Sequence, residues 1–154
     1  MVLYVTLFFK LFFKLSTWCI DFSNAFVQAT LEDDIFVHLP HGFHSINGTN
    51  VCLKLKKSLY GITQAPQLWF KHLKAKLEKH GFTQSELDPC LFYSESVMLA
   101  SWADDLVLVS RDSTSLDALI VDLKTDSELT DEGKLTAFLG IKVAHTDDGK
   151  QFTL

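Results

Sequence analysis

Two adjacent acids, Asp104 and Asp105, stand between two apolar, β-leaning runs, residues 94–101 and 106–110. This pattern predicts a tight hairpin with carboxylates at its tip. Two carboxylates at one tip repel each other unless a cation lies beside them, and Mg²⁺ prefers a few carboxylates together with phosphate oxygens. An Asp-Asp pair is also ordinary turn chemistry, since Asp favours turns. The pair alone therefore leaves a plain turn and a metal site as alternatives.

A third acid favours the metal site. Asp21 lies near the end of another apolar run, residues 17–22, which is typical of a strand. If two strands end in acids at the same edge of one sheet, Asp21, Asp104 and Asp105 form a site of three carboxylates. Such sites hold two metal ions and promote in-line displacement at phosphorus. The sequence thus predicts a two-metal site for phosphorus chemistry.

Composition allows one domain with a packed core. The chain has 154 residues, 47% of them hydrophobic and 21% charged, with a formal net charge of −5. A nucleic-acid binder normally carries a basic field. Half of the 14 basic residues fall within residues 54–79, so the acidic chain can still present a basic face.

The cysteines and histidines give weaker signals. Three cysteines without metal-ligand spacing favour free thiols in a reducing compartment. His38, His41 and His44 are close in sequence, but no Cys or acid completes a zinc site around them. We expect them in a solvated loop.

The first residues, Met1 to Leu15, are strongly apolar and admit three interpretations. A signal peptide has an uninterrupted apolar core, and a transmembrane helix needs about 20 apolar residues. Lys10 and Lys14 interrupt the run and argue against both. We expect residues 1–16 to form a helix packed on a sheet, without membrane contact.

Two further helices are expected. Pro66 suits the first position of a helix and Gly81 its end, and the apolar stripe of that helix comprises Leu68, Phe70, Leu73, Leu77 and Phe82. A second helix begins at Asp112-Ser113, with a buried stripe of Leu116, Leu119, Ile120 and Leu123. Short strands are predicted over residues 35–39 and 51–55, and a polar connection over residues 128–133. Strands and helices in this order indicate a sheet with helices on one face.

Four blocks of the sequence, in this order, resemble the reverse transcriptase of copia-type retrotransposons. The blocks are Asp21-Phe22-Ser23-Asn24-Ala25-Phe26, Lys56-Lys57-Ser58-Leu59-Tyr60-Gly61-Ile62-Thr63-Gln64-Ala65-Pro66-Gln67-Leu68-Trp69, Trp102-Ala103-Asp104-Asp105 and Phe138-Leu139-Gly140-Ile141-Lys142-Val143. The third stands where the family has Tyr-Val-Asp-Asp.

The resemblance implies an α+β fold, the palm of a right-hand polymerase, over residues 17–154. Its antiparallel sheet is packed by helices on one face, and fingers and thumb are incomplete. The implied activity is RNA-directed DNA polymerisation on a primed RNA or DNA template with deoxynucleoside triphosphates.

The same resemblance implies site residues. Asp21, Asp104 and Asp105 would be catalytic and would hold two Mg²⁺ ions, or Mn²⁺ in their place, with the Phe22 carbonyl as a further ligand. The nucleotide would contact Phe26, Gln64, Ala65 and Pro66, and the primer would be supported by Leu139 and Gly140. Phe26 would act as an aromatic gate against a 2′-hydroxyl; its alternative is a plain core residue.

Some residues depart from the family pattern. Thr63 and Gln67 replace a Lys and an Arg, which predicts weaker phosphate binding. No basic fingers segment stands ahead of Asp21, and thumb and RNase H regions are not recognised after Val143. We therefore expect a truncated copy of a polyprotein, located in the cytoplasm or a virus-like particle and not secreted. The alternative function is a catalytically inactive remnant that acts at most as a binding module.

Overall fold

The structure is a computed structural model that describes residues 15–44, 51–138 and 141–142. The chain divides into two units. The first combines residues 1–24 and 74–154, and the second comprises residues 25–73. The expected helix over residues 1–16, except its last two residues, and the expected support residues Leu139 and Gly140 lie outside the described residues.

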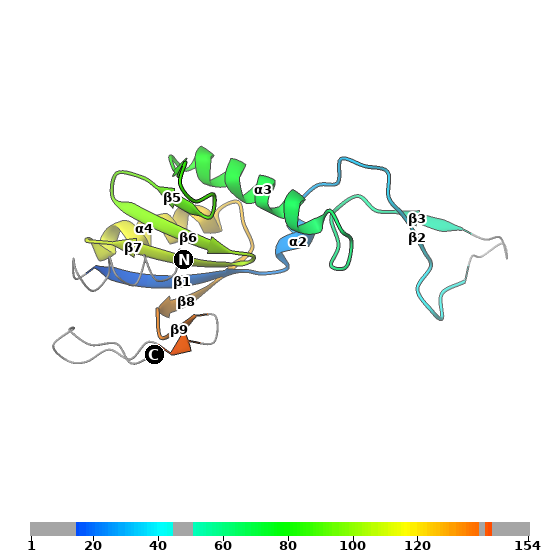
Figure 1. The fold of residues 1–154 in the computed structure, drawn as a ribbon. Coiled ribbons are helices and arrows are strands. Elements are labelled where there is room, and N and C mark those ends of the chain that lie inside the picture. The colour runs from blue at the N-terminus through cyan, green and yellow to red at the C-terminus, as the bar shows by residue number, and fades with distance from the viewer. Residues whose placement is uncertain (1–14, 45–50, 139–140, 143–154) are drawn as a thin grey trace. The chain divides into compact units, whose positions relative to one another are not determined.

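A six-stranded sheet forms the centre of the first unit (Figure 1). Its strands pair antiparallel in the order β4-β5-β6-β7-β1-β8. Their bounds are β1 Ser16–Phe22, β4 Thr83–Gln84, β5 Leu91–Tyr93, β6 Val97–Trp102, β7 Asp105–Ser110 and β8 Leu129–Lys134. The predicted antiparallel sheet in a mixed fold is confirmed. A separate hairpin pairs β9, Ala137–Phe138, with β10, Ile141–Lys142.

Strand β7 is buried on both faces, because its side chains alternate between two covered sides of the sheet. Leu106 and Leu108 are fully buried on one side. On the other side Val107 and Val109 pack with Cys19 and Leu135 in a small apolar cluster. The continuous apolar run of residues 106–110 thus forms a strand inside the sheet, between β6 and β1.

Helix α3, Ala65–Lys79, ends where Gly81 was expected to end it. Gly81 has a φ of +81°, and the Phe82 amide donates to the Leu77 carbonyl at 3.0 Å. This is the hydrogen bond of a Schellman cap, which favours glycine at the left-handed position. The predicted apolar stripe was partly wrong. Leu68 and Phe70 are only half-buried, and the line of fully buried side chains is Ala65, Trp69, Leu73 and Leu77, at successive intervals of four.

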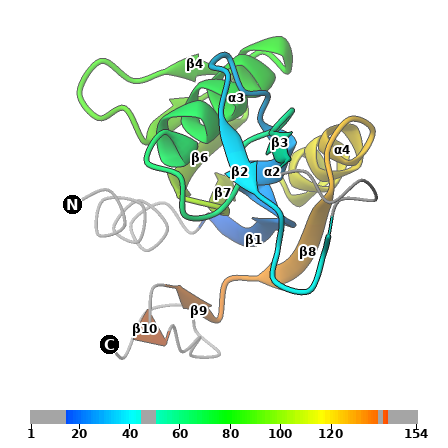
Figure 2. The ribbon, with the colours of Figure 1, turned by 90° about the vertical axis from the view of Figure 1, so that its right-hand side faces the viewer.

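Helix α4, Ser113–Lys124, begins as predicted. The Asp112 carboxylate accepts a hydrogen bond from the Thr114 amide at 3.1 Å, which caps the helix. Leu116, Ile120 and Leu123 are buried, and α4 contacts β7 and β8. Figure 2 shows α4 beside β8.

The polar connection predicted over residues 128–133 is wrong, because this segment is strand β8 at the edge of the sheet. It pairs with β1, and the register between the two strands shifts between Cys19 and Ile20 of β1, opposite Gly133 and Asp131. An edge strand faces solvent, so its polar sequence, with Asp131 and Glu132, carries no apolar alternation. Only the pairing partner makes this segment a strand.

The second unit holds a short helix and a two-stranded ribbon. Helix α2 is Ala25–Gln28, and strands β2, Phe36–His38, and β3, Cys52–Lys54, pair antiparallel. Both predicted strands are confirmed in shorter form. The ribbon is largely exposed, and an ion pair between Lys54 and Asp34 lies beside it. Of the helices that the structure describes, none is both long and apolar enough for a membrane crossing.

Candidate active site

The turn between β6 and β7 carries the two adjacent acids. Trp102 and Asp105 are cross-strand partners, so Ala103 and Asp104 are the two central residues of a hairpin turn. Ala103 has a φ of +54°, whereas Asp104 does not share the left-handed conformation. A positive φ at the first central position alone is the pattern of a type II′ turn, which favours glycine there. The turn thus holds Asp104 just beyond the strands at the expense of a strained Ala103.

The third acid lies directly across from this turn. Asp21 on β1 is the register partner of Asp105 on β7. The Phe22 amide donates to the Asp104 carbonyl at 2.9 Å, so the neighbouring residues form the hydrogen-bonded pair. Asp21 and Asp105 therefore form a non-hydrogen-bonded pair, in which the Cα atoms are only about 4.5 Å apart and the side chains share one face. The structure brings Asp21, Asp104 and Asp105 together at one end of the sheet.

These carboxylates act on one another electrostatically. Partial burial raises the pKa of the Asp21 carboxyl, and the Asp104 carboxylate raises it further. Burial also raises the pKa of Asp105, and its neighbours Asp104, Asp21 and Glu132 add to the effect in that order. Among the residues that the structure describes, the charges that raise the pKa of Asp105 belong to these three acids. Such an arrangement favours protons or a cation.

The donor set fits a hard divalent cation in chemistry and charge. Mg²⁺ is held by one or two carboxylates together with phosphate oxygens of a substrate, so the protein need not supply a full ligand cage. Within residues 15–44, 51–138 and 141–142, no group of three or more His, Cys, Asp or Glu side chains is gathered closely enough to hold an ion by itself. The three acids by themselves therefore do not form a closed metal cage.

The residues expected to line a nucleotide pocket belong to the second unit. Phe26 lies on α2, Gln64 directly precedes α3, and Ala65 and Pro66 are the first two residues of α3. Ala65 is buried, so its side chain is closed to a ligand, whereas Gln64 and Pro66 are exposed. Phe26 is half-buried, and its ring contacts Tyr60.

Two residues near these sites were not predicted. Tyr60 belongs to one of the four sequence blocks, but the sequence predicted no role for it. The feature that could have indicated one is an aromatic residue directly before Gly61 in a turn. Glu132 lay in the segment predicted as a connection, and the register shift between β8 and β1 brings its charge to Asp105. No local pattern marks Glu132, because its position depends on how β8 pairs with β1.

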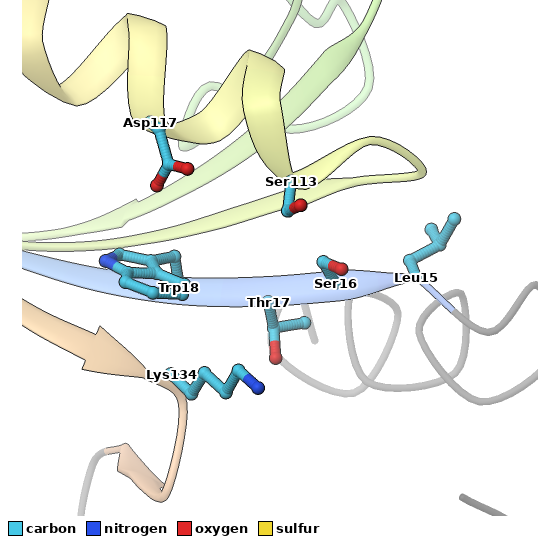
Figure 3. Close-up of a pocket in the computed structure, with 7 residues that line it drawn as sticks. All are labelled: Leu15, Ser16, Thr17, Trp18, Ser113, Asp117 and Lys134. Atoms are coloured by element: carbon cyan, nitrogen blue, oxygen red, sulfur yellow. The ribbon is translucent and has the colours of Figure 1, made fainter.

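The first unit also contains a cavity of about 480 Å³ (Figure 3). It is lined by Leu15, Ser16, Thr17, Trp18, Ser113, Asp117 and Lys134. Trp18 precedes Asp21 by three positions on β1, and side chains alternate along a strand, so the two point to opposite faces. The Trp18 indole donates a hydrogen bond to Asp131, which fixes its ring. The cavity is therefore separate from the acids.

Comparison with known proteins places this arrangement in a family. Residues 13–154 match the family model described as reverse transcriptase (RNA-dependent DNA polymerase). The chain belongs to this family. Its relatives include proteins of copia-type transposons, and the resemblance stated above is thereby confirmed.

Three relatives illustrate the match. The Retrovirus-related Pol polyprotein from transposon RE1 of Arabidopsis thaliana is 34% identical over 84% of this chain and 9% of its own length. The polyprotein from transposon TNT 1-94 of Nicotiana tabacum is 28% identical over 88% of this chain and 10% of its own length. A putative transposon Ty5-1 protein of Saccharomyces cerevisiae is 28% identical over 84% of this chain and 43% of its own length. The chain thus spans about a tenth of the first two relatives.

Proposed function

We propose that this chain carries the nucleotidyl-transfer site of a reverse transcriptase, with Asp21, Asp104 and Asp105 as its catalytic acids. The observation that carries the proposal is the cross-strand pair of Asp21 and Asp105, with Asp104 in the adjoining turn. Three mutually repelling carboxylates at the open end of a sheet destabilise the fold unless they bind something positive. Family membership makes a divalent cation the natural ligand.

Two Mg²⁺ ions, or Mn²⁺ in their place, would be held by Asp21, Asp104 and Asp105 together with the Phe22 carbonyl. Bound there, they would supply Lewis-acid activation of the primer 3′-hydroxyl and charge stabilisation at the leaving pyrophosphate. The protein's own contribution is to hold the carboxylates in fixed register. The hydrogen bond from the Phe22 amide to the Asp104 carbonyl and the paired strands keep Asp21 opposite Asp105 before any substrate arrives.

The second unit would receive the incoming nucleotide. We assign the sugar to Phe26, where a bulky ring would clash with a 2′-hydroxyl, and the base and phosphates to the segment around Gln64 and Pro66. Leu139 and Gly140 would support the primer. The partners are then a primed RNA or DNA template and deoxynucleoside triphosphates, and the setting is intracellular, in the cytoplasm or a virus-like particle.

The test is incorporation of a deoxynucleotide on a primed RNA template with and without Mg²⁺. We expect Mg²⁺-dependent incorporation that falls about a hundredfold or more in Asp104→Asn, the loss that about 3 kcal/mol of transition-state stabilisation produces. Asp117→Asn, an exposed acid on α4, is the matched control and should leave incorporation unchanged. Equal incorporation by the wild type and Asp104→Asn would refute the proposal.

A second candidate function is a non-catalytic remnant of a transposon polyprotein. It is favoured by Thr63 and Gln67, two exposed neutral residues where the family pattern has cations. Titration with a labelled primer-template separates the two functions. A polymerase site predicts tight binding that weakens steeply with salt, whereas a remnant predicts weak binding or none.

A further inference from the structure

The Phe26 ring is in contact with an aromatic residue from a distant part of the second unit. The ring centroids of Phe26 and Tyr60 are 4.5 Å apart, and the ring planes are inclined by 43°. Tilted contacts at this distance are favourable for aromatic pairs. The Tyr60 ring therefore restricts the rotamers that the Phe26 side chain can adopt on that side.

Tyr60 is held in place by the turn that contains it. The Ile62 amide donates to the Leu59 carbonyl at 3.3 Å, and Gly61 has a φ of +96°. A positive φ at the third residue of a four-residue turn defines a type II turn and favours glycine there. The turn thus presents Tyr60 at its second position.

Backbone contacts join this turn to the segment of α2. The Ser58 amide donates to the Ala29 carbonyl at 2.9 Å, and Thr30 forms an isolated bridge with Lys57. The Lys57 ammonium also donates to the Gln28 carbonyl at 3.4 Å. These main-chain contacts hold the two segments side by side, which keeps Tyr60 close to Phe26.

The contact is not part of the hydrophobic core. Tyr60 is 50% exposed, and α2 is a helix of four residues in which Ala25 is the buried one. Phe26 is only half-buried, and a helix of one turn offers few neighbours that could hold its ring in a single rotamer. Tyr60 supplies the restraint that α2 lacks.

We propose that Tyr60 is a positioning residue that fixes the Phe26 ring and thereby sets the selection of deoxyribonucleotides over ribonucleotides. This inference rests on the proposed function, in which Phe26 faces the sugar of the nucleotide. Tyr60 acts through Phe26 and need not touch the substrate. Its aromatic ring carries the effect, and its hydroxyl does not.

The experiment measures by competition, in the presence of Mg²⁺, the affinities of the chain for dTTP and for ribothymidine triphosphate, which differ only in the 2′-hydroxyl. We expect Tyr60→Ala to lower the preference for dTTP by about fivefold to tenfold, the effect of losing one favourable aromatic contact. Tyr60→Phe should keep the wild-type preference. Tyr93→Ala, which removes a Tyr of similar exposure from β5, is the matched control and should also keep it.

Combined variants separate this inference from the proposed function. If Tyr60 acts through Phe26, the double variant Phe26→Ala with Tyr60→Ala selects no worse than Phe26→Ala alone. If Phe26→Ala loses the preference and Tyr60→Ala keeps it, the role of Tyr60 is refuted while the nucleotide site stands. A wild-type chain that binds neither nucleotide, or both equally, would overturn the proposed site and this inference together.

Discussion

Two charged clusters of the first unit are built on opposite principles. The acid trio, defined as Asp21, Asp104 and Asp105, sets like charges against one another. The ion-pair network joins the C-terminal ends of α3 and α4 with opposite charges. In it Lys79 donates to Asp126 at 2.9 Å, Lys76 bonds to the Asp126 carbonyl and the Ser127 hydroxyl, and the His80 ring bonds to Asp122.

The two clusters shift the pKa of their carboxyls in opposite directions. In the network the hydrogen bond from Lys79 is the main cause that lowers the pKa of Asp126, to about 2. In the acid trio burial and like charge raise the pKa of Asp21 and Asp105. The network therefore stabilises the fold at neutral pH, whereas the acid trio opposes it. This contrast separates a structural cluster from a candidate site, because carboxyls with a raised pKa are typical of functional sites.

The largest expected effect comes from breaking the network. Asp126→Ala leaves Lys76 and Lys79 without their carboxylate, and we expect the free energy of unfolding to fall by about 1 kcal/mol at pH 7, because solvent screens this partly exposed network. Asp126 has a folded-state pKa below its usual value of 3.8. Its contribution is therefore complete above that pH and is lost as the pH falls through about 2. Denaturant unfolding at several pH values measures it.

Asp117→Ala is the control for this variant, since Asp117 is an exposed acid on α4. It should change the unfolding free energy little, as exposed surface charges usually do. A wild-type midpoint for Asp126→Ala at pH 7 would show that the network contributes nothing to the fold.

A smaller effect of opposite sign is expected in the acid trio. Asp105→Asn removes one of two like charges that face each other across the strands, and we expect it to raise the unfolding free energy at pH 7 by roughly 0.5–1 kcal/mol in the absence of metal. A raised folded-state pKa means that the folded chain binds more protons than the unfolded chain near pH 4. The penalty is therefore absent in acid and develops as the pH rises through that range.

Mg²⁺ provides the second readout for the same variant. It should raise the melting temperature of the wild type and have a smaller effect on Asp105→Asn, because a ligand that binds the folded state stabilises it. Asp117→Asn should respond to Mg²⁺ as the wild type does. A loss of stability in Asp105→Asn without metal would contradict the repulsion on which the contrast depends.

The smallest expected effect concerns the strained turn. Ala103→Gly relieves the strain of a non-glycine residue at a φ of +54°, but it also makes the unfolded chain more flexible. We expect the free energy of unfolding to rise by about 0.5 kcal/mol as the net result of these two effects. Ala100→Gly, in the buried middle of β6, is the paired control and should destabilise. Differential scanning calorimetry of both variants measures the two signs. A destabilised Ala103→Gly would mean that the turn is not strained.

The sequence predicted elements that are governed by local chemistry. The caps at Asp112 and Gly81 lie where short-range patterns placed them, and the apolar run of β7 predicted a strand. The predictions from the sequence were wrong where residues far apart in the chain determine the secondary structure or the burial. The segment of β8 is polar and becomes a strand only by pairing with β1. In α3 the buried side chains are those in line with Trp69, because the tertiary packing decides which face of the helix is covered.

The candidate site divides in the same way. Sequence motifs alone identified the three acids and the family, because a motif is a property of neighbouring residues. The register that sets Asp21 against Asp105, the register shift that brings Glu132 near them and the contact of Tyr60 with Phe26 were decided by tertiary structure. The physical reason is that pairing between remote segments depends on the packing and backbone hydrogen bonds of the whole sheet or turn, which no short window of sequence contains.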